Sequence, residues 1–312
     1  MKIINFGSLN MDRVYRVADF VVPGRTIAAK GLETFAGGKG LNQSIASARG
    51  GASVLHAGAI GMDGGLLLAA LREAGVDVSL IESKEEQPSG HAIIQVSDSG
   101  ENAIIVHGGA NQGLDEAYVR RVLDGATDGD LILVQNETSM VPFIMEESRR
   151  RGREVCFNPS PVSPGLSEYP LHCVDRFILN LDEAEAIAGS KEGPAGLLRI
   201  LLDRYSRAEI VLTLGAEGAM VGRGPERWVE PAFPVLPLDT TAAGDCFAGF
   251  YLAAIARGEL DPRFRLRIAQ KAASICVQRR GASPSIPTLA ETLAALEKAE
   301  GSSLRLEGFS GT

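Results

Sequence analysis

The sequence has few cysteines and no motif that would pair them. Its 312 residues include four cysteines, Cys156, Cys173, Cys246 and Cys276, and none forms a Cys-x-x-Cys arrangement. Scattered cysteines of this kind are typical of free thiols in a reducing compartment. A chain of this length buries enough surface to fold without a disulfide or a structural metal.

Long apolar runs are also absent. No segment approaches the roughly 20 apolar residues that cross a membrane. The N-terminal residues MKIINFGSLNMD have neither the charge pattern nor the cleavage site of a secretory signal. The sequence therefore predicts a soluble, cytoplasmic protein with no membrane partner.

Positive charge is in deficit. The 31 Lys and Arg residues are outnumbered by 39 Asp and Glu residues, which gives a net charge of −8. Because an acidic surface repels phosphate backbones, a nucleic-acid partner is not expected. Any anionic ligand would have to be held by local groups rather than by the overall field of the protein.

Short apolar runs alternate with helical patterns along most of the chain. The near-continuous apolar runs predict strands covered on both faces, at Lys2–Gly7, Ser53–Ile60, Asp130–Gln135, Glu154–Asn158, Arg176–Asn180 and Ile210–Leu214. Helical patterns occupy Leu41–Arg49, Gly65–Ala74, Leu114–Leu123, Ser139–Arg151, Ala195–Tyr205, Gly244–Arg257, Pro262–Arg280 and Leu289–Ala299. The alternation indicates an α/β fold with a mostly parallel central sheet, whose ligands bind beyond the carboxyl ends of the strands.

Two regions interrupt this alternation with β-type runs that have no helix between them. One contains Arg13–Phe20 and Thr26–Phe35. The other contains His91–Ser97 and Asn102–His107, joined by a hairpin signal at Asp98–Glu101. Together they predict a small antiparallel sheet, a lid formed by about residues 13–35 and 91–107. With no linker and no internal repeat, residues 1–312 are predicted to form a single domain that carries this lid.

The common nucleotide-binding loops, GxxxxGK[ST] and GxGxxG, do not occur. The best candidate for phosphate binding is the segment Asp239–Asp245, DTTAAGD, which directly precedes a helical run. Small residues at a helix start leave backbone N–H groups uncovered, and the helix dipole adds partial positive charge there. Asp245 would lie beside such a phosphate and could accept the proton of an attacking hydroxyl. The alternative is that Asp245 only caps the helix.

A second candidate is the segment Phe35–Gln43, FAGGKGLNQ, which also opens a helix. Its glycines permit close approach of the backbone to a ligand. Lys39 and Asn42 supply hydrogen-bond donors suited to a polyhydroxylated molecule. The alternative is a glycine-rich turn with an exposed lysine.

Taken together, AGGKGLNQ and DTTAAGD resemble the two signature segments of the ribokinase family of ATP-dependent sugar kinases, the PfkB-type carbohydrate kinases. The resemblance covers nearly the whole chain, in the right order. Further segments that resemble the family's are Gly7–Asp12 with Asn10 and Asp12, Gly58–Asp63, Glu101–Asn102, Gly108–Asn111, Gln135–Glu137, Asn158–Pro161, Asn180–Glu183, Thr213–Gly218 and Arg280–Ser285.

The resemblance implies a three-layer ribokinase-like α/β fold and a role for each matching residue. Asp245 would be the general base, and the N–H groups of Ala242, Ala243 and Gly244 would hold the transferring phosphoryl group. The sugar would be held by Asn10, Asp12, Gly38, Lys39, Asn42, Glu137 and Asp245. ATP and magnesium would be bound by Asn180, Glu183, Thr213, Gly215, Gly218 and Gly244. The family commonly has glycine where Ala242 stands, and we expect alanine to fit there with a negative φ.

The resemblance also implies a potassium site and a homodimer formed through the lid. The ligands of the cation would be Asp239, Thr241, Ser285 and the backbone carbonyls of Cys276, Arg279 and Gly281. Oxygen ligands of this kind suit a hard cation. The alternative is that Asp239 only orders its turn through neighbouring N–H groups.

The polar set of sugar residues favours a free sugar over a nucleoside, whose base would require apolar or aromatic surface. The full match to the family at these positions favours ribose, phosphorylated on its primary O5 hydroxyl. The alternatives are a kinase for fructose, 2-keto-3-deoxygluconate or a nucleoside, or a non-catalytic sensor of sugar or nucleotide on the same fold.

Overall fold

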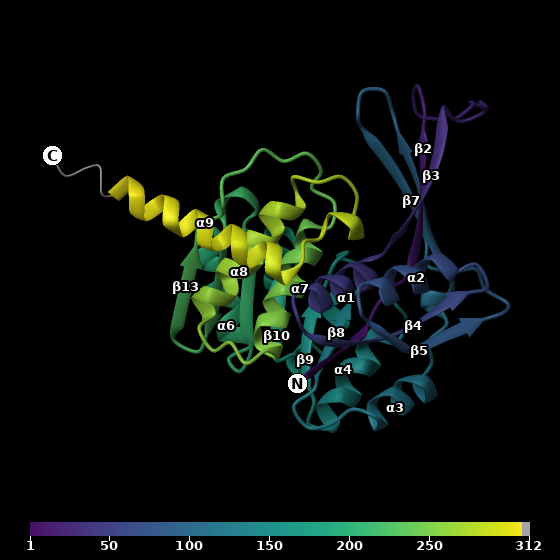
Figure 1. Cartoon of the computed structure of the whole chain (residues 1–312). Helices are drawn as coiled ribbons and strands as arrows, with labels where there is room; N and C mark the ends of the chain where they lie inside the picture. The colour runs from purple at the N-terminus through teal and green to yellow at the C-terminus, as the bar shows by residue number, and fades with distance from the viewer. Residues whose placement is uncertain (308–312) are drawn as a thin grey trace.

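The computed structural model describes residues 1–307, in which a large sheet lies between two layers of helices and a smaller sheet projects from it (Figure 1). In this part of the chain the large sheet has nine strands, in the order β13-β12-β11-β10-β9-β8-β1-β4-β5. Their bounds are β1 Lys2–Phe6, β4 Ser53–Gly61, β5 Asp77–Lys84, β8 Leu131–Gln135, β9 Glu154–Asn158, β10 Arg176–Leu179, β11 Glu209–Thr213, β12 Ala219–Arg223 and β13 Glu226–Glu230. The pairs β11–β12 and β12–β13 are antiparallel and the others parallel, as the α/β prediction requires.

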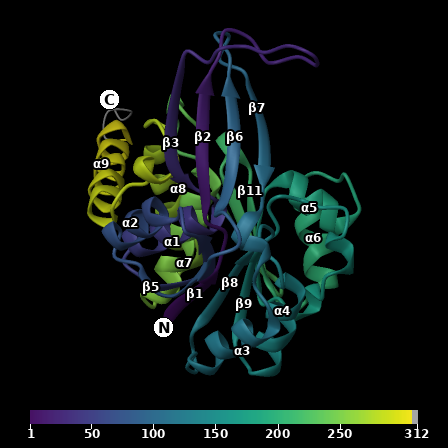
Figure 2. The same cartoon turned by 90° about the vertical axis from the view of Figure 1, so that its right-hand side faces the viewer.

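The helices cover both faces of this sheet (Figure 2). One layer consists of α1 Lys39–Arg49, α2 Gly65–Glu73, α7 Ala243–Ala256, α8 Pro262–Cys276 and α9 Leu289–Glu307. The other consists of α3 Glu116–Asp124, α4 Val141–Arg150, α5 Leu181–Ala188 and α6 Pro194–Arg204. Each layer encloses its own cluster of buried apolar side chains.

Successive residues of the central strands supply the two clusters in turn. In β1, Ile3 packs under α1 and α7, while Ile4 packs under the opposite layer. In β8, Leu133 and Val134 divide in the same way. A strand whose two faces are both covered has no solvent side, which explains the near-continuous apolar runs in the sequence.

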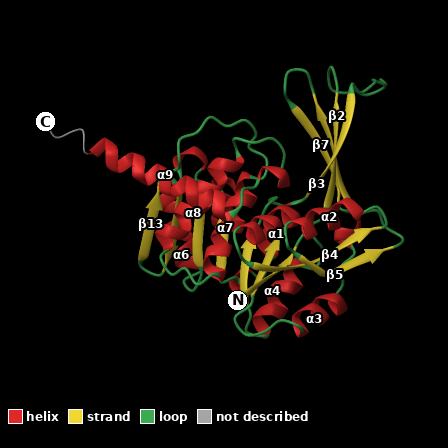
Figure 3. Ribbon diagram, viewed as in Figure 1, coloured by secondary structure: helices red, strands yellow, loops and turns green. Residues whose placement is uncertain are grey.

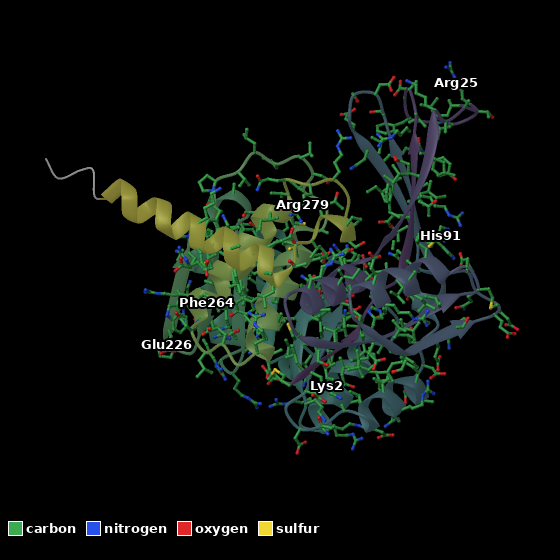
Figure 4. The ribbon with its side chains drawn as sticks, viewed as in Figure 1. Lys2, Arg25, His91, Glu226, Phe264 and Arg279 are labelled. Atoms are coloured by element: carbon green, nitrogen blue, oxygen red, sulfur yellow. The ribbon has the colours of Figure 1, made fainter. Side chains whose placement is uncertain are left out.

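The smaller sheet stands clear of the central body, with Arg25 near its tip and His91 near its base (Figures 3 and 4). Its four strands within the described residues have the order β3-β2-β6-β7. Their bounds are β2 Asn10–Arg16, β3 Gly31–Gly37, β6 Gly90–Val96 and β7 Asn102–His107. The two predicted lid segments therefore form one sheet. The expectation of an antiparallel sheet was wrong at its centre, because β2 and β6 pair in parallel.

Several predicted boundaries were also wrong. β2 ends at Arg16 rather than Phe20, β3 begins at Gly31 rather than Thr26, and α8 ends at Cys276 rather than Arg280. The last helix continues past Ala299 to Glu307. In the part of the chain that the structure describes, no helix is long and apolar enough to span a membrane.

Candidate active site

A pocket lies at the carboxyl ends of the central parallel strands. The last residues of β9, β10 and β11 line one side of it, and the turn that opens α7 lines the other. Its full lining is Lys39, Asn158, Ser160, Ile178, Leu179, Asn180, Glu183, Thr213, Thr240, Ala242, Ala243, Gly244 and Asp245. The pocket therefore brings together both candidate segments, AGGKGLNQ and DTTAAGD, as parallel α/β topology predicts.

Asp245 lies in the first turn of α7, where it is buried with 8% of its surface exposed. Its Oδ1 accepts a hydrogen bond from Gln43 Nε2 at 2.9 Å, and its Oδ2 accepts one from Asn42 Nδ2 at 3.0 Å. Both oxygens of Asp245 thus accept from side chains of α1, and no side-chain capping bond is formed at the start of α7. Burial raises the pKa of the Asp245 carboxyl, while the charge of Lys39 and the two amide donors oppose that rise.

The turn before α7 contains one unusual backbone conformation. Ala242 is the residue before the helix and has φ 60° and ψ 8°, in the left-handed region. The expectation of a negative φ at this position was therefore wrong. A left-handed alanine costs roughly 1–2 kcal/mol. The gain is that the chain turns abruptly into α7, so that residues 242–244 line the pocket at the positive end of the helix dipole.

Glu137 joins the sugar-binding candidates to the pocket. Its carboxylate accepts hydrogen bonds from the Ser8 hydroxyl and from the backbone N–H of Lys39, the latter at 3.0 Å. Burial raises the pKa of Glu137, and hydrogen bonding to Ser8 and the charge of Lys39 oppose this. Burial, together with the nearby charge of Glu137, raises the pKa of Asp12 to about 7. Two carboxyl groups thus share one partly closed space.

The strand register places Asp12 on one face of the small sheet. Residues directly opposite one another across paired strands project from the same face. Phe35, Asp12, Ala92 and Val106 therefore form one row across all four strands. The face that carries Asp12 is the one turned toward the site, and its remaining positions in this row are apolar.

The orientation of Asn10 is set by Asn111. The Asn111 amide donates to Asn10 Oδ1 at 2.7 Å, and Asn111 Oδ1 accepts from the backbone N–H of Leu9 at 2.9 Å. With its oxygen occupied, Asn10 retains its nitrogen for a ligand. Asn42 has the opposite polarity, because its nitrogen is bonded to Asp245 while its buried Oδ1 has no partner among the described residues.

The residues predicted for nucleotide and magnesium divide into two groups. Asn180 and Glu183 form a capping box at the start of α5, with Glu183 N donating to Asn180 Oδ1 at 2.8 Å. Both line the pocket, as does Thr213, the last residue of β11. Gly215 and Gly218 do not line it; they form the turn from β11 to β12, where Leu214 N donates to Gly218 O.

The predicted cation ligands lie in two loops that meet behind the turn of α7. The Asp239 carboxylate accepts from the N–H groups of Thr241 and Gly281, each at 2.9 Å, and so links the two loops. The Cys276 thiol lies 3.0 Å from Ser285 Oγ and 3.9 Å from the Thr241 carbonyl. Arg279, the remaining member, lies between them and forms an ion pair with Glu291. Asp239 thus orders its turn as the alternative stated, while the Thr241 carbonyl and Ser285 Oγ both lie near the Cys276 thiol, and the Cys276 carbonyl accepts from the Arg279 N–H.

Several residues of the site were not predicted from the sequence as site residues, including the pocket-lining residues Asn158, Ser160, Ile178, Leu179 and Thr240 and three hydrogen-bond partners of predicted residues. Ser8 bonds to Glu137, Asn111 orients Asn10, and Gln43 bonds to Asp245. Gln43 and Asn111 stood in quoted motifs, AGGKGLNQ and GGAN, but no pattern indicated their partners. Ser8 lies two residues after the end of β1, within GSLNMD, where a small polar residue gives no distinct signal.

Comparisons with known proteins agree in both sequence and structure. A family model described as pfkB family carbohydrate kinase matches residues 1–289. A ribokinase from Haemophilus influenzae is 36% identical over 301 residues, covering 94% of this chain and 97% of that protein. A ribokinase structure from Thermotoga maritima superposes with a TM-score of 0.86 at 31% identity, covering 95% of this chain and 99% of that one. An Arabidopsis thaliana ribokinase complexed with ribose and ATP gives a TM-score of 0.85 at 27% identity, covering 95% and 98%.

Proposed function

This chain belongs to the pfkB family of carbohydrate kinases, as its glycine-rich segments predicted, and we propose that it is an ATP-dependent ribokinase that phosphorylates O5 of D-ribose. The observation that carries the proposal is the position of Asp245. Its carboxylate lies in the pocket at the start of α7, and Asn42, from the sugar-binding segment, donates to it. A hydroxyl bound there would have a base on one side and the helix start on the other.

Asp245 is proposed as the general base that accepts the proton of the sugar O5 as the phosphoryl group is transferred. The N–H groups of Ala242, Ala243 and Gly244 would stabilise charge on that group, because they lie in a pocket at the N-terminus of α7. Transfer of this kind needs positioning and charge stabilisation more than covalent chemistry from the protein.

Magnesium would be held on the other side of the pocket, near Glu183. This carboxylate is buried, lines the pocket and lies beside the amide of Asn158. Carboxylate oxygens suit a hard divalent cation. When bound with ATP, magnesium would neutralise negative charge on the phosphates. Asn180, Thr213, Gly215 and Gly218 are proposed for the nucleotide.

The charge of the sugar-binding region favours a neutral sugar. The charge of Glu137 is felt at Asp12, and the charge of Asp245 is felt at Glu137, while Lys39 is the one cation among the proposed sugar residues. The carboxylate of 2-keto-3-deoxygluconate would be repelled there. The proposed sugar ligands Asn10, Asp12, Gly38, Lys39, Asn42 and Glu137 include no aromatic residue that could stack on a nucleoside base.

Potassium, a homodimer and a cytoplasmic location complete the proposal. The cation would be bound by Asp239, Thr241, Ser285 and the carbonyls of Cys276, Arg279 and Gly281; in support, Asp239 links the two segments through the Gly281 N–H, and the Thr241 carbonyl and Ser285 Oγ both lie near the Cys276 thiol. The apolar face of the small sheet would pair with that of a second copy. All four cysteines are free thiols, which supports a reducing, cytoplasmic environment.

The experiment that tests the function is a coupled ADP-release assay over a panel of sugars and nucleosides. D-Ribose should give the highest kcat/KM, fructose and nucleosides much less, and 2-keto-3-deoxygluconate the least. A preference for another sugar would correct the substrate. Binding of ribose and ATP without ADP release would favour the non-catalytic sensor.

A further inference from the structure

A chain of buried polar side chains leads from Asp245 into the interior. Gln43 Nε2 donates to Asp245 Oδ1 and also to Asn158 Oδ1, each at 2.9 Å. Gln135 Nε2 donates to Gln43 Oε1 at 2.8 Å and to Asn5 Oδ1 at 2.9 Å. Gln43 is fully buried, so no water competes for these bonds.

The chain continues to an imidazole beneath α1. Asn5 Nδ2 donates to the Gly40 carbonyl and to Ser44 Oγ, each at 2.8 Å. Ser44 Oγ lies 2.8 Å from His56 Nδ1, and His56 Nε2 lies 3.1 Å from the Gly7 carbonyl. Asn5, Ser44 and His56 are fully buried.

At one end of this series of hydrogen-bonded side chains, a backbone carbonyl determines which amide atom is the nitrogen and which is the oxygen. A carbonyl only accepts hydrogen bonds, so the Asn158 atom that faces the Ile178 carbonyl at 2.9 Å must be its nitrogen. The Asn158 oxygen then faces Gln43, which must present its nitrogen to both Asn158 and Asp245. The Gln43 oxygen is therefore left to accept from Gln135.

The other end leads to the same arrangement. The Gly40 carbonyl requires the nitrogen of Asn5, so the Asn5 oxygen faces Gln135. The Gly7 carbonyl requires His56 to carry its proton on Nε2, so Nδ1 accepts from Ser44. Both ends therefore require that Gln135 direct its nitrogen toward the oxygens of Asn5 and Gln43. The buried Oε1 of Gln135 then has no partner among the described residues.

We propose that Gln43 is a positioning residue for the catalytic base, and that Gln135, Asn5, Ser44 and a neutral His56 hold its amide nitrogen toward Asp245. Reversal of any amide in the chain would set two oxygens or two N–H groups against each other. Such a clash in a buried network costs more than the hydrogen bond itself. The network therefore admits one orientation.

The consequence for the reaction rests on the proposed function. Donors to a carboxylate stabilise its charged form, which is the form that accepts a proton. Burial raises the pKa of Asp245, and the hydrogen bond from Gln43 opposes that rise. Gln43 donates from a fixed direction, so it favours the ionised form of the base before the sugar arrives.

The first test uses the unmodified protein and needs no activity. Nitrogen-15 NMR of the four histidine rings distinguishes the two neutral tautomers and the imidazolium. His56, assigned by its loss in His56→Asn, should be the Nε2–H tautomer from about pH 8 down to about pH 5, because burial lowers its pKa to about 4. An Nδ1–H tautomer or an imidazolium at neutral pH would overturn the proposed polarity.

The second test measures the pH dependence of kcat/KM, whose acidic limb reports the ionisation of the base in the free enzyme. Gln43→Met retains bulk but removes the donor, and should move this limb upward by about one pH unit. Gln135→Met should move it in the same direction by less. The double variant should not exceed Gln43→Met, because both act through one bond.

Gln270→Met is the matched control. Gln270 is also a buried glutamine; its side chain donates to the Glu230 carbonyl, makes no other hydrogen bond among the described residues and does not line the pocket. It should leave the acidic limb in place. An unmoved limb in folded Gln43→Met would refute the proposal, and if that variant does not fold, Gln135→Met and the His56 tautomer decide. A wild-type protein that does not phosphorylate ribose would refute the proposed function instead, while the tautomer would still test the network.

Discussion

Helix α1 and the small sheet depart from the usual burial pattern in opposite directions. In α1, the polar residues Asn42, Gln43 and Ser44 are buried. In β7, Ile104 and Val106 expose 53% and 62% of their surface. One region thus places polar groups in the interior and the other places apolar groups in solvent.

Both arrangements differ from the one that folding stability alone would favour, in which apolar side chains are buried and polar side chains are exposed. The polar groups of α1 are stable inside because they bond to one another and to the chain, and this requires a single arrangement. The apolar residues of the small sheet have no such internal solution and are exposed, and under the proposed function a ligand or a second copy would bury them. The first region is satisfied within this chain except at Asn42 Oδ1 and Ser47 Oγ, which have no partner among the described residues, whereas the second is exposed to solvent.

The sharpest way to break the buried region is Asp245→Asn. The substitution preserves size and the start of α7 but removes the base, so turnover should fall by roughly a hundredfold or more while ribose still binds. Turnover by ADP release and ribose binding by calorimetry measure the two effects. Asp261→Asn, at the start of α8, is the control and should be silent. Near-normal turnover in a folded Asp245→Asn would remove this residue from the mechanism.

The exposed region can be broken at Ile104, on the face that carries Asp12. If that face pairs with a second copy, Ile104→Lys should raise the dimer dissociation constant at least about tenfold, because it buries a charge at an apolar contact. Light scattering over a dilution series measures this. Leu260→Lys changes an equally apolar residue with 86% exposure away from the sheet and should have no effect. A monomeric wild-type protein at micromolar concentration would contradict the dimer itself.

Removal of potassium should affect the turn before α7, where Asp239 and Thr241 are proposed to bind the cation. A bound cation would neutralise Asp239 and fix the turn before α7, so activity at constant ionic strength should be several-fold higher in potassium than in tetramethylammonium salts. Sodium should support much less activity. Asp239→Ala should abolish the difference between salts. Equal rates in wild type would show that the cation site is empty or unimportant.

The last prediction concerns stability rather than activity and is made at Asp12, whose carboxyl lies near Glu137. Because the folded pKa of about 7 lies above the unfolded value, the folded state binds the extra proton, and this contribution to stability is lost as the pH rises toward 7 and above. Asp12→Asn should therefore gain about 2 kcal/mol relative to wild type between about pH 4 and pH 8, less than the full shift implies because the residue is partly exposed. Urea unfolding at several pH values measures the difference, and a constant difference would show that Asp12 titrates normally.

The sequence predicted the central strands because a near-continuous apolar run such as DLILVQ is typical of a strand that is covered on both faces. It missed β5 and β13, which lie at the edges and carry exposed charged residues such as Glu226, and it also missed β12, a mostly buried strand between β13 and β11. Helix α5 was also missed. Its start, Asn180–Glu183, was interpreted as a ligand motif, yet the same residues form a capping box.

Some features of the candidate site could likewise be predicted from local sequence, and others could not. Lys39 and Asp245 could be placed together because each belongs to a glycine-rich or small-residue turn at the carboxyl end of the sheet. The orientation of Gln43 could not be predicted, because it depends on Asn158 and Gln135, which lie far along the chain. The φ of Ala242 likewise depends on the angle at which α7 leaves its turn.

The packing of α1 against α7 also bears on the order in which the ribosome makes the protein. Asn42 and Gln43 emerge early, but the carboxylate that they bind is on α7, about two hundred residues later. A nascent chain that ends before residue 239 has its sugar-binding residues and no base. Such a chain would be catalytically silent, and the unpaired donors of α1 would favour hydration over premature closure of the core. Activity would then begin when α7 docks, late in synthesis.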